Sequence, residues 1–258
     1  MGHIRLGNLP QTLKWRQLIA LLESGADDES LAKATLDAAS RRLAGAGSDD
    51  ALVHAFWLLT QIPLAARKPD LPQALRDLGL PVSSPPSVLA VACGLADAVD
   101  ANATTSGHRS DLAEMALLSA SESITTLGTR KAGALFGTTP EDVRHALAEL
   151  STKKWFGLLT REFVARFLTR FLAYHLGRET SNYVGPEKKF GNLTEHAAFY
   201  DALQLHCRQA SLIVQDFAGG WFTKAEYETG ITPERASRFL HHAFTKVRRE
   251  LNRGGPAS

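Results

Sequence analysis

Apolar residues recur at spacings of three and four along nearly the whole chain, and no segment alternates convincingly between apolar and polar residues. Spacings of three and four place side chains on one face of an α-helix, whereas strict alternation is typical of a half-buried β-strand. The sequence therefore predicts an all-α protein, built as a multi-helix bundle. No fixed-period repeat is visible, although small-residue helices between positions 11 and 60 would suit an array of helical hairpins.

The chain has 258 residues, of which 44% are hydrophobic and 22% are charged. This length suits one large domain or two small ones with a substantial core. The segment 80–87 contains three prolines and three serines, a composition that favours a connection between helical regions. We therefore expect an N-terminal helical lobe over residues 1–80, packed against a larger helical bundle over residues 81–258. One continuous domain is the alternative.

Start and stop signals divide the second half of the chain. Thr139 followed by Pro140 and two acidic residues predicts a helix start, because Thr caps well and Pro fits the first turn. The segment 153–176 is apolar around more than half of its circumference, which predicts the central helix of the bundle. A long loop is expected over 177–193, and the next helix, from Thr194, is expected to stop at Gly219-Gly220, before a short helix over 223–228.

The segment 232–253 predicts an amphipathic C-terminal helix with a basic outer face. Its apolar positions recur at helical spacing: Ala236, Phe239, Leu240, Ala243, Val247 and Leu251. Its candidate binding residues fall on the opposite side: Arg235, Arg238, His241, His242, Arg248, Arg249 and Arg253. Such a face is typical of a solvated outer helix, of a docking surface for an acidic protein, or of a nucleic-acid contact.

A helix–turn–helix-like unit is the basis of the nucleic-acid alternative. With Gly230 as the turn glycine, the last helix would be the recognition helix, with Arg238 facing guanine edges and Arg248 or Arg249 facing phosphates. Two positions fit this pattern poorly, because Glu226 stands where a small residue should pack and Thr229 where an apolar one should. DNA or RNA binding therefore remains an alternative to protein binding.

Charge is divided unevenly along the chain, although the net charge is only +2. Residues 1–150 contain 13 Lys and Arg against 17 Asp and Glu, a balance of −4. Residues 151–258 contain 16 against 10, a balance of +6. A basic second half suits an acidic partner, which would be nucleic acid, another protein or the chain's own acidic half.

Two further features are candidate sites. Trp221 and Phe222 follow the double glycine and would anchor a protein partner, because aromatic residues are enriched at interface hot spots. The loop after the central helix has the polar variety of a binding site, with Arg178, Lys188 and Lys189 as its candidate residues. A helical enzyme that uses this loop is a second alternative, for which Glu179 and Ser181 would be the reactive groups.

Signals for known chemistries are missing from the sequence. It contains no Gly-x-Ser-x-Gly elbow, no Walker loop and no dinucleotide-binding glycine pattern. Neighbouring pairs such as His206-Cys207 point to different sides of a helix, which argues against a metal site or a local Cys–His dyad. Asp111, Glu114 and Glu122 form an acidic edge, more typical of a docking edge than of an active site. We therefore expect no cofactor and no catalytic or metal-binding residues.

The most consistent interpretation is a non-enzymatic helical adaptor, or a subunit of a bacterial multi-protein assembly, that binds a protein partner. Cys93 and Cys207 lie too far apart in sequence to suggest a disulfide framework, which favours a reducing cytoplasm. No membrane-spanning helix and no signal peptide are expected. Homo-oligomerisation stays open.

Overall fold

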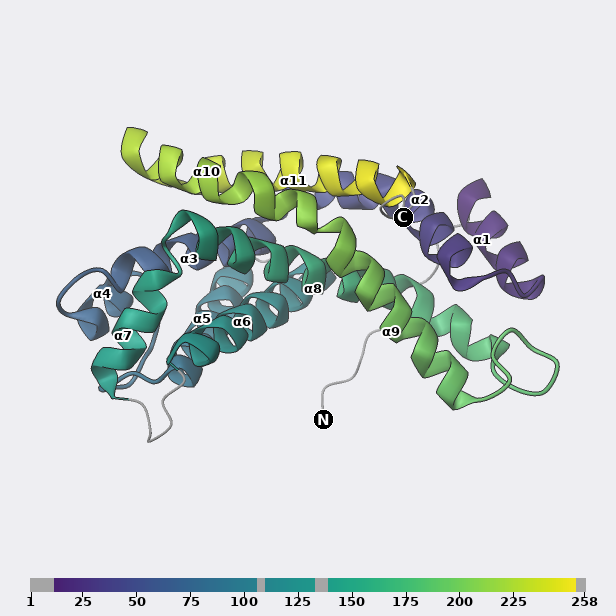
Figure 1. The fold of residues 1–258 in the computed structure, drawn as a ribbon, viewed down its shortest axis with the longest axis horizontal. Helices are drawn as coiled ribbons and strands as arrows, with labels where there is room; N and C mark the ends of the chain where they lie inside the picture. Colours follow the sequence, from purple (N-terminus) through teal and green to yellow (C-terminus); the bar gives the residue numbers. More distant parts are fainter. Residues whose placement is uncertain (1–11, 106–109, 133–138, 254–258) are drawn as a thin grey trace.

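The computed structural model describes residues 12–105, 110–132 and 139–253, with the side chains of residues 36, 178 and 251–253 outside the description (Figure 1). The expected all-α multi-helix bundle is confirmed: the described residues form α-helices and one short 3₁₀-helix, with no strand. The elements are α1 Leu13–Glu23, α2 Asp28–Ala46, α3 Asp50–Ala65, α4 Leu71–Asp77, α5 Val88–Thr105, α6 Asp111–Ala132, α7 Pro140–Glu149, α8 Lys153–Thr180, η1 Ser181–Tyr183, α9 Leu193–Ala210, α10 Leu212–Glu228 and α11 Pro233–Arg253. None of these helices is long and apolar enough to cross a lipid bilayer.

The central position expected for the apolar helix is confirmed. α8 packs against α6, α9 and α10, and its apolar side chains are buried along most of its length. Phe163, Phe167 and Phe171 form a column of stacked rings along it, with ring centroids 6.4 and 6.0 Å apart. A helix that is apolar around most of its circumference needs neighbours on several sides, and α8 has them.

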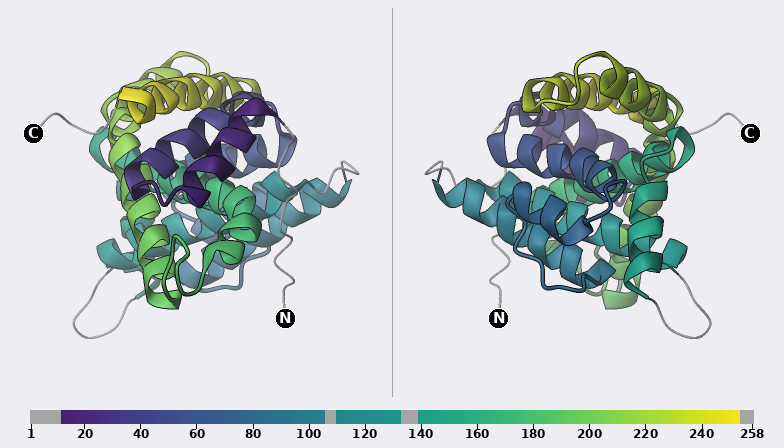
Figure 2. Two further views of the ribbon diagram at one scale, coloured as in Figure 1. Left: turned by 90° about the vertical axis from the view of Figure 1, so that its right-hand side faces the viewer. Right: turned by 90° about the vertical axis from the view of Figure 1, so that its left-hand side faces the viewer.

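The helices lie in layers on either side of this central element. α10 and α11 cover one side of the molecule, α2 and α3 lie beneath them, and α5 and α6 form the opposite side (Figures 1 and 2). One hydrophobic cluster of buried side chains extends from Trp15 to Val247. α3 belongs to the proposed N-terminal lobe, yet it packs against α5, α6 and α11. The core is therefore shared across residue 80.

Side-chain caps begin several helices where the sequence predicts a start. Thr139 and Asp142 form a reciprocal capping box at the start of α7, with Pro140 in the first turn. The Asp49 carboxylate accepts the Leu52 amide at 3.0 Å at the start of α3. These caps satisfy amide groups that have no partner within the helix.

Two expected boundaries in the second half are wrong. The helix after the loop ends at Ala210 rather than at Gly219-Gly220, and α10 then runs without a break through both glycines. A Cβ atom on Gly219 would lie 2.0 Å from the Lys153 carbonyl oxygen. The glycine is therefore required for close packing of α10 on α8, rather than for a helix stop.

The expected loop over 177–193 is shorter than the sequence suggests. α8 continues to Thr180 and η1 follows directly. The remaining turn is closed by a bridge between Val184 and Phe190. Phe190 is buried and packs against Phe199 of α9, with ring centroids 5.4 Å apart. The burial of Phe190 thus holds this polar segment in a compact loop.

Candidate functional site

The apolar stripe of α11 seats this helix on the N-terminal half of the chain. Ala236, Leu240, Ala243 and Val247 are fully buried, as expected from their spacing, and α11 packs against α2, α3, α9 and α10. The expected position Leu251 lies outside the described side chains. The other face of the helix is therefore the part of α11 that remains for solvent or a partner.

Arg235 does not belong to that outer face. Its guanidinium donates to the carbonyl oxygens of Ala225 at 2.9 Å and Gly230 at 3.2 Å, and it pairs with Glu228 at 2.7 Å. All three partners lie in α10 or in the turn that follows it. Arg235 thus closes the α10–α11 turn, and the prediction that it faces a partner is not supported by its contacts.

His241 is also engaged within the molecule. Its Nε2 lies 2.9 Å from the Ser48 hydroxyl, and a Cβ atom on Gly47 would come within 2.9 Å of its ring. One turn earlier, the Ser237 hydroxyl donates to the Gly47 carbonyl at 2.8 Å. α11 therefore packs directly on the turn between α2 and α3. The sequence does not predict this contact.

The remaining basic residues form a stripe along the outer face. The stripe consists of Arg238, His242, Lys246 and Arg249, with Arg248 at its edge. Arg238, His242 and Arg249 are exposed, and Lys246 and Arg248 are partly so. None of the five forms an ion pair with another described residue. The side chain of Arg253, at the end of the expected face, lies outside the described residues. We call these five residues the outer stripe.

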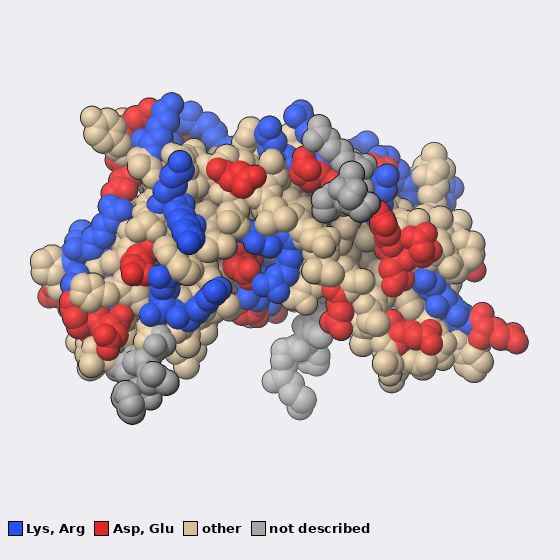
Figure 3. All heavy atoms as spheres, viewed as in Figure 1, with Lys and Arg blue, Asp and Glu red and all other residues tan. Residues whose placement is uncertain are grey.

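Basic side chains follow the upper edge of the molecule in Figure 3, where α10 and α11 lie in Figure 1, and acidic side chains gather near the loop before α9. Acidic side chains also lie along this edge, so the outer stripe belongs to a surface of mixed charge. Cations without an ion-pair partner among the described residues remain available for an anionic surface.

The turn glycine of the expected helix–turn–helix-like unit has the conformation that the pattern requires. Gly230 has a φ of +79°, a value that favours glycine. The Trp57 indole donates to the neighbouring Ile231 carbonyl at 2.9 Å, which ties this turn to α3. Arg235 and His241, two of the residues expected to face a groove of DNA, contact this protein instead. α10 and α11 run in opposite directions in Figure 1.

The two aromatic residues expected to anchor a partner are packed inside the protein. Phe222 is fully buried and stacks on Phe156, with ring centroids 4.0 Å apart. Trp221 is half-buried, and its ring lies 4.3 Å from that of Phe239. Because Gly219 does not end the helix, both residues continue α10 along α8 and α11. Phe222 is a core residue and is not exposed to a partner.

The candidate cations of the loop are largely held within the molecule. Lys189 pairs with Asp28 at 3.1 Å, and the Lys188 ammonium donates to the Asn182 carbonyl at 2.8 Å. The side chain of Arg178 lies outside the described residues. Near the end of α9, Cys207 is fully buried, and burial raises the pKa of its thiol to about 12, which removes it as a nucleophile.

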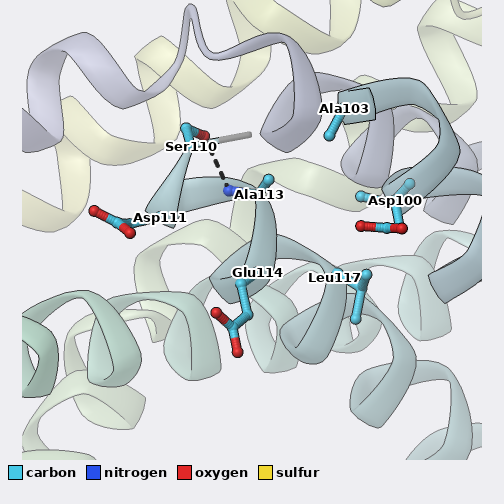
Figure 4. Close-up of a pocket in the computed structure, with 8 residues that line it drawn as sticks. Asp100, Ala103, Ser110, Asp111, Ala113, Glu114 and Leu117 are labelled. Atoms are coloured by element: carbon cyan, nitrogen blue, oxygen red, sulfur yellow. Dashed lines mark hydrogen bonds between the residues drawn. The ribbon is translucent and has the colours of Figure 1, made fainter. Parts of the chain in front are cut away.

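Two adjoining hollows at the start of α6 were not expected from the sequence. The first, of about 300 Å³, lies between the end of α5 and the first turns of α6, and Asp100, Asp111 and Glu114 are among its lining residues (Figure 4). Ser110 caps α6 here, since its hydroxyl oxygen accepts the Ala113 amide at 3.1 Å. Across the described residues, no group of three His, Cys, Asp or Glu side chains is placed to hold a metal ion.

The second hollow, of about 430 Å³, lies between α2, α6 and α8 and shares Ser110 and Asp111 with the first. Arg42 of α2 and His175 of α8 line it. His175 is 1% exposed, and burial together with the Arg42 charge lowers its pKa to about 4, against an opposing effect of Asp111. Only the packing of α2, α6 and α8 reveals these surroundings of His175.

Comparison with known proteins identifies no relative: no protein-family model, no curated protein and no solved structure matches this chain. The class of protein is therefore defined by the fold alone, as an all-α multi-helix bundle.

Proposed function

We propose that this protein is a non-enzymatic helical adaptor, or a subunit of a multi-protein assembly, which binds an acidic protein partner on the outer face of α11. The observation that carries the proposal is the outer stripe: basic side chains at helical spacing with no ion-pair partner among the described residues. Other basic residues of the second half, such as Arg166, Arg208 and Arg235, are paired with carboxylates.

Protein binding is favoured over nucleic-acid binding by the way in which α11 is seated. A recognition helix reads bases with side chains near its N-terminus. In the first turns of α11, Arg235 and His241 are engaged within the molecule, which leaves Arg238 and His242 exposed there. Arg238 and Arg249, the exposed arginines of the outer stripe, lie about three turns apart, which suits ion pairs spread over a protein surface. We place this activity in the cytoplasm, a proposal supported by two free cysteines, one of them the exposed Cys93.

The test is co-purification of the tagged protein from its own organism, combined with charge reversal. The test variant carries Arg238→Glu and Arg249→Glu. The matched control carries Lys68→Glu and Arg76→Glu, which make the same change in net charge at exposed positions next to and within α4. Thermal unfolding of both variants checks that the fold is retained.

We expect the test variant to bind a co-purifying acidic protein at least tenfold more weakly, and the control to bind it like the wild type. Equal retention by both variants would overturn the proposal. A nuclease-sensitive interaction would instead favour nucleic acid. In that case, affinity in a gel-shift assay would fall steeply between 50 and 200 mM salt, with a logarithmic slope of about −2 to −4 for two to four phosphate contacts.

A further inference from the structure

The hollow between α2, α6 and α8 has the form of a small-molecule site. Its volume of about 430 Å³ falls within the usual range of ligand pockets, about 300–1,000 Å³. Leu112, Met115 and Phe171 give it an apolar wall, and Arg42 and His175 are polar residues on the same lining. An apolar wall combined with a few fixed polar groups is the arrangement by which proteins orient small organic ligands.

His175 presents a buried polar atom that no described residue satisfies. Its Nδ1 is buried and has no hydrogen-bonding partner within the described part of the chain. Buried polar atoms nearly always have a partner, since leaving one unsatisfied costs about 1–3 kcal/mol. The ring is held between Trp15, at a centroid distance of 5.5 Å, and the edges of Phe171 and Tyr174, each at 5.1 Å. The imidazole is therefore fixed before any ligand arrives.

The charges around the ring favour an anion. Arg42 is exposed and forms no ion pair with any described residue. Asp111, on the opposite wall, accepts a hydrogen bond from the Tyr174 hydroxyl. Arg42 and Asp111 shift the pKa of His175 in opposite directions, and Arg42 has the larger effect. Because burial keeps the imidazole neutral at pH 7, Nδ1 can carry a proton and donate it to an acceptor.

We propose that this hollow binds a small organic carboxylate with an apolar body, whose carboxylate lies between the Arg42 guanidinium and the His175 imidazole. The apolar body would lie against Leu112, Met115 and Phe171. A guanidinium at the mouth supplies charge and a buried neutral donor supplies direction, the combination that binds carboxylates in proteins. The site contains no residue of the outer stripe. Failure of the ligand proposal would therefore leave the proposal of partner binding on α11 unaffected, and the reverse also holds.

Calorimetric titration of the full chain at pH 7 with phenylacetate tests the proposal, with phenylacetamide as the neutral analogue and phenethylamine as the cationic one. Arg42→Gln removes the charge from an exposed position and should leave the fold intact. Arg41→Gln is the matched control, because Arg41 is the exposed neighbour that does not line the hollow. Met115→Trp fills the hollow while retaining both polar groups.

We expect saturable binding of phenylacetate with a dissociation constant in the low millimolar range or tighter, at least tenfold weaker binding of the amide, and no tighter binding of the amine. Arg42→Gln should weaken binding of the acid at least tenfold, Arg41→Gln should leave it unchanged, and Met115→Trp should abolish it. Ring ¹⁵N resonances of His175 should shift on addition of the acid. Lack of saturation at 50 mM phenylacetate, equal effects of Arg41→Gln and Arg42→Gln, or preference for the amine would each overturn the proposal.

Discussion

Two helices of this protein carry several arginines each, and one pair of arginines on each helix is used in the opposite way to the other pair. On α8, Arg166 and Arg170 both contact Glu122 of α6, and their side chains are only 20% and 26% exposed. On α11, Arg238 and Arg249 are exposed and form no ion pair with a described residue. The sequence pattern of the two helices differs mainly in hydrophobicity. The two pairs differ in whether a carboxylate of the same chain lies within ion-pair distance.

The largest effect should come from the contact that fixes α10 on α8. We expect Gly219→Ala to lower the free energy of unfolding by about 3 kcal/mol, because the new methyl group would overlap the Lys153 carbonyl. Gly220→Ala is the matched control, since a Cβ there meets no atom within 4 Å. It should be neutral or stabilise the helix by up to about 1 kcal/mol. Urea unfolding measures both, and equal stability of the two variants would contradict the close packing.

The second effect concerns His175, which lies near the end of α8. Its pKa of about 4 in the folded protein lies below the ordinary value of 6.5, so the unfolded chain binds a proton first as the pH falls. Stability from this residue is therefore complete above pH 6.5 and lost as the pH falls towards 4. We expect the free energy of unfolding to drop by about 2 kcal/mol more between pH 7 and pH 5 in the wild type than in His175→Leu. Parallel pH dependences would show that His175 is accessible to protons in the folded state.

The third effect concerns the carboxylate that Arg166 and Arg170 of α8 share. We expect Glu122→Gln to lower the free energy of unfolding by about 1.5 kcal/mol, because it removes the shared partner of two partly buried guanidinium groups. Glu114→Gln, on the exposed side of the same helix, should change it by no more than about 0.5 kcal/mol. Similar losses in the two variants would remove the distinction between α8 and α11.

The smallest effect is expected on α11 itself. Arg238→Ala should change the free energy of unfolding by less than about 0.5 kcal/mol, because an exposed arginine without an ion pair contributes little to stability. Arg235→Ala should cost about 1 kcal/mol, since this residue binds two carbonyl oxygens and Glu228. Urea unfolding of these two variants compares an arginine without an ion pair among the described residues with a paired one in the same helix. A large loss in Arg238→Ala would place that residue among the structural arginines.

Much of the fold could be read from the sequence, because its signals are local. The capping box at Thr139, the apolar circumference of α8 and the stripe of α11 each depend on residues within a few turns of one another. The helix boundaries that the sequence predicts wrongly lie at glycines. Gly230 ends a helix through a positive φ, whereas Gly219 serves a close contact with another helix. Neighbouring residues do not distinguish these two uses.

The candidate sites were less predictable, because availability is a property of the whole fold. The sequence by itself determined that the chain forms a helical bundle, that α8 is central, and that α11 carries a basic face, since helical period and polarity fix these features. Only the tertiary structure decided which of these residues are held by other elements of the fold: Arg235 and His241 are, whereas Arg238 and Arg249 form no ion pair with a described residue. The same holds for His175 and Arg42, which lie far apart in sequence and share a hollow only because α2, α6 and α8 pack together.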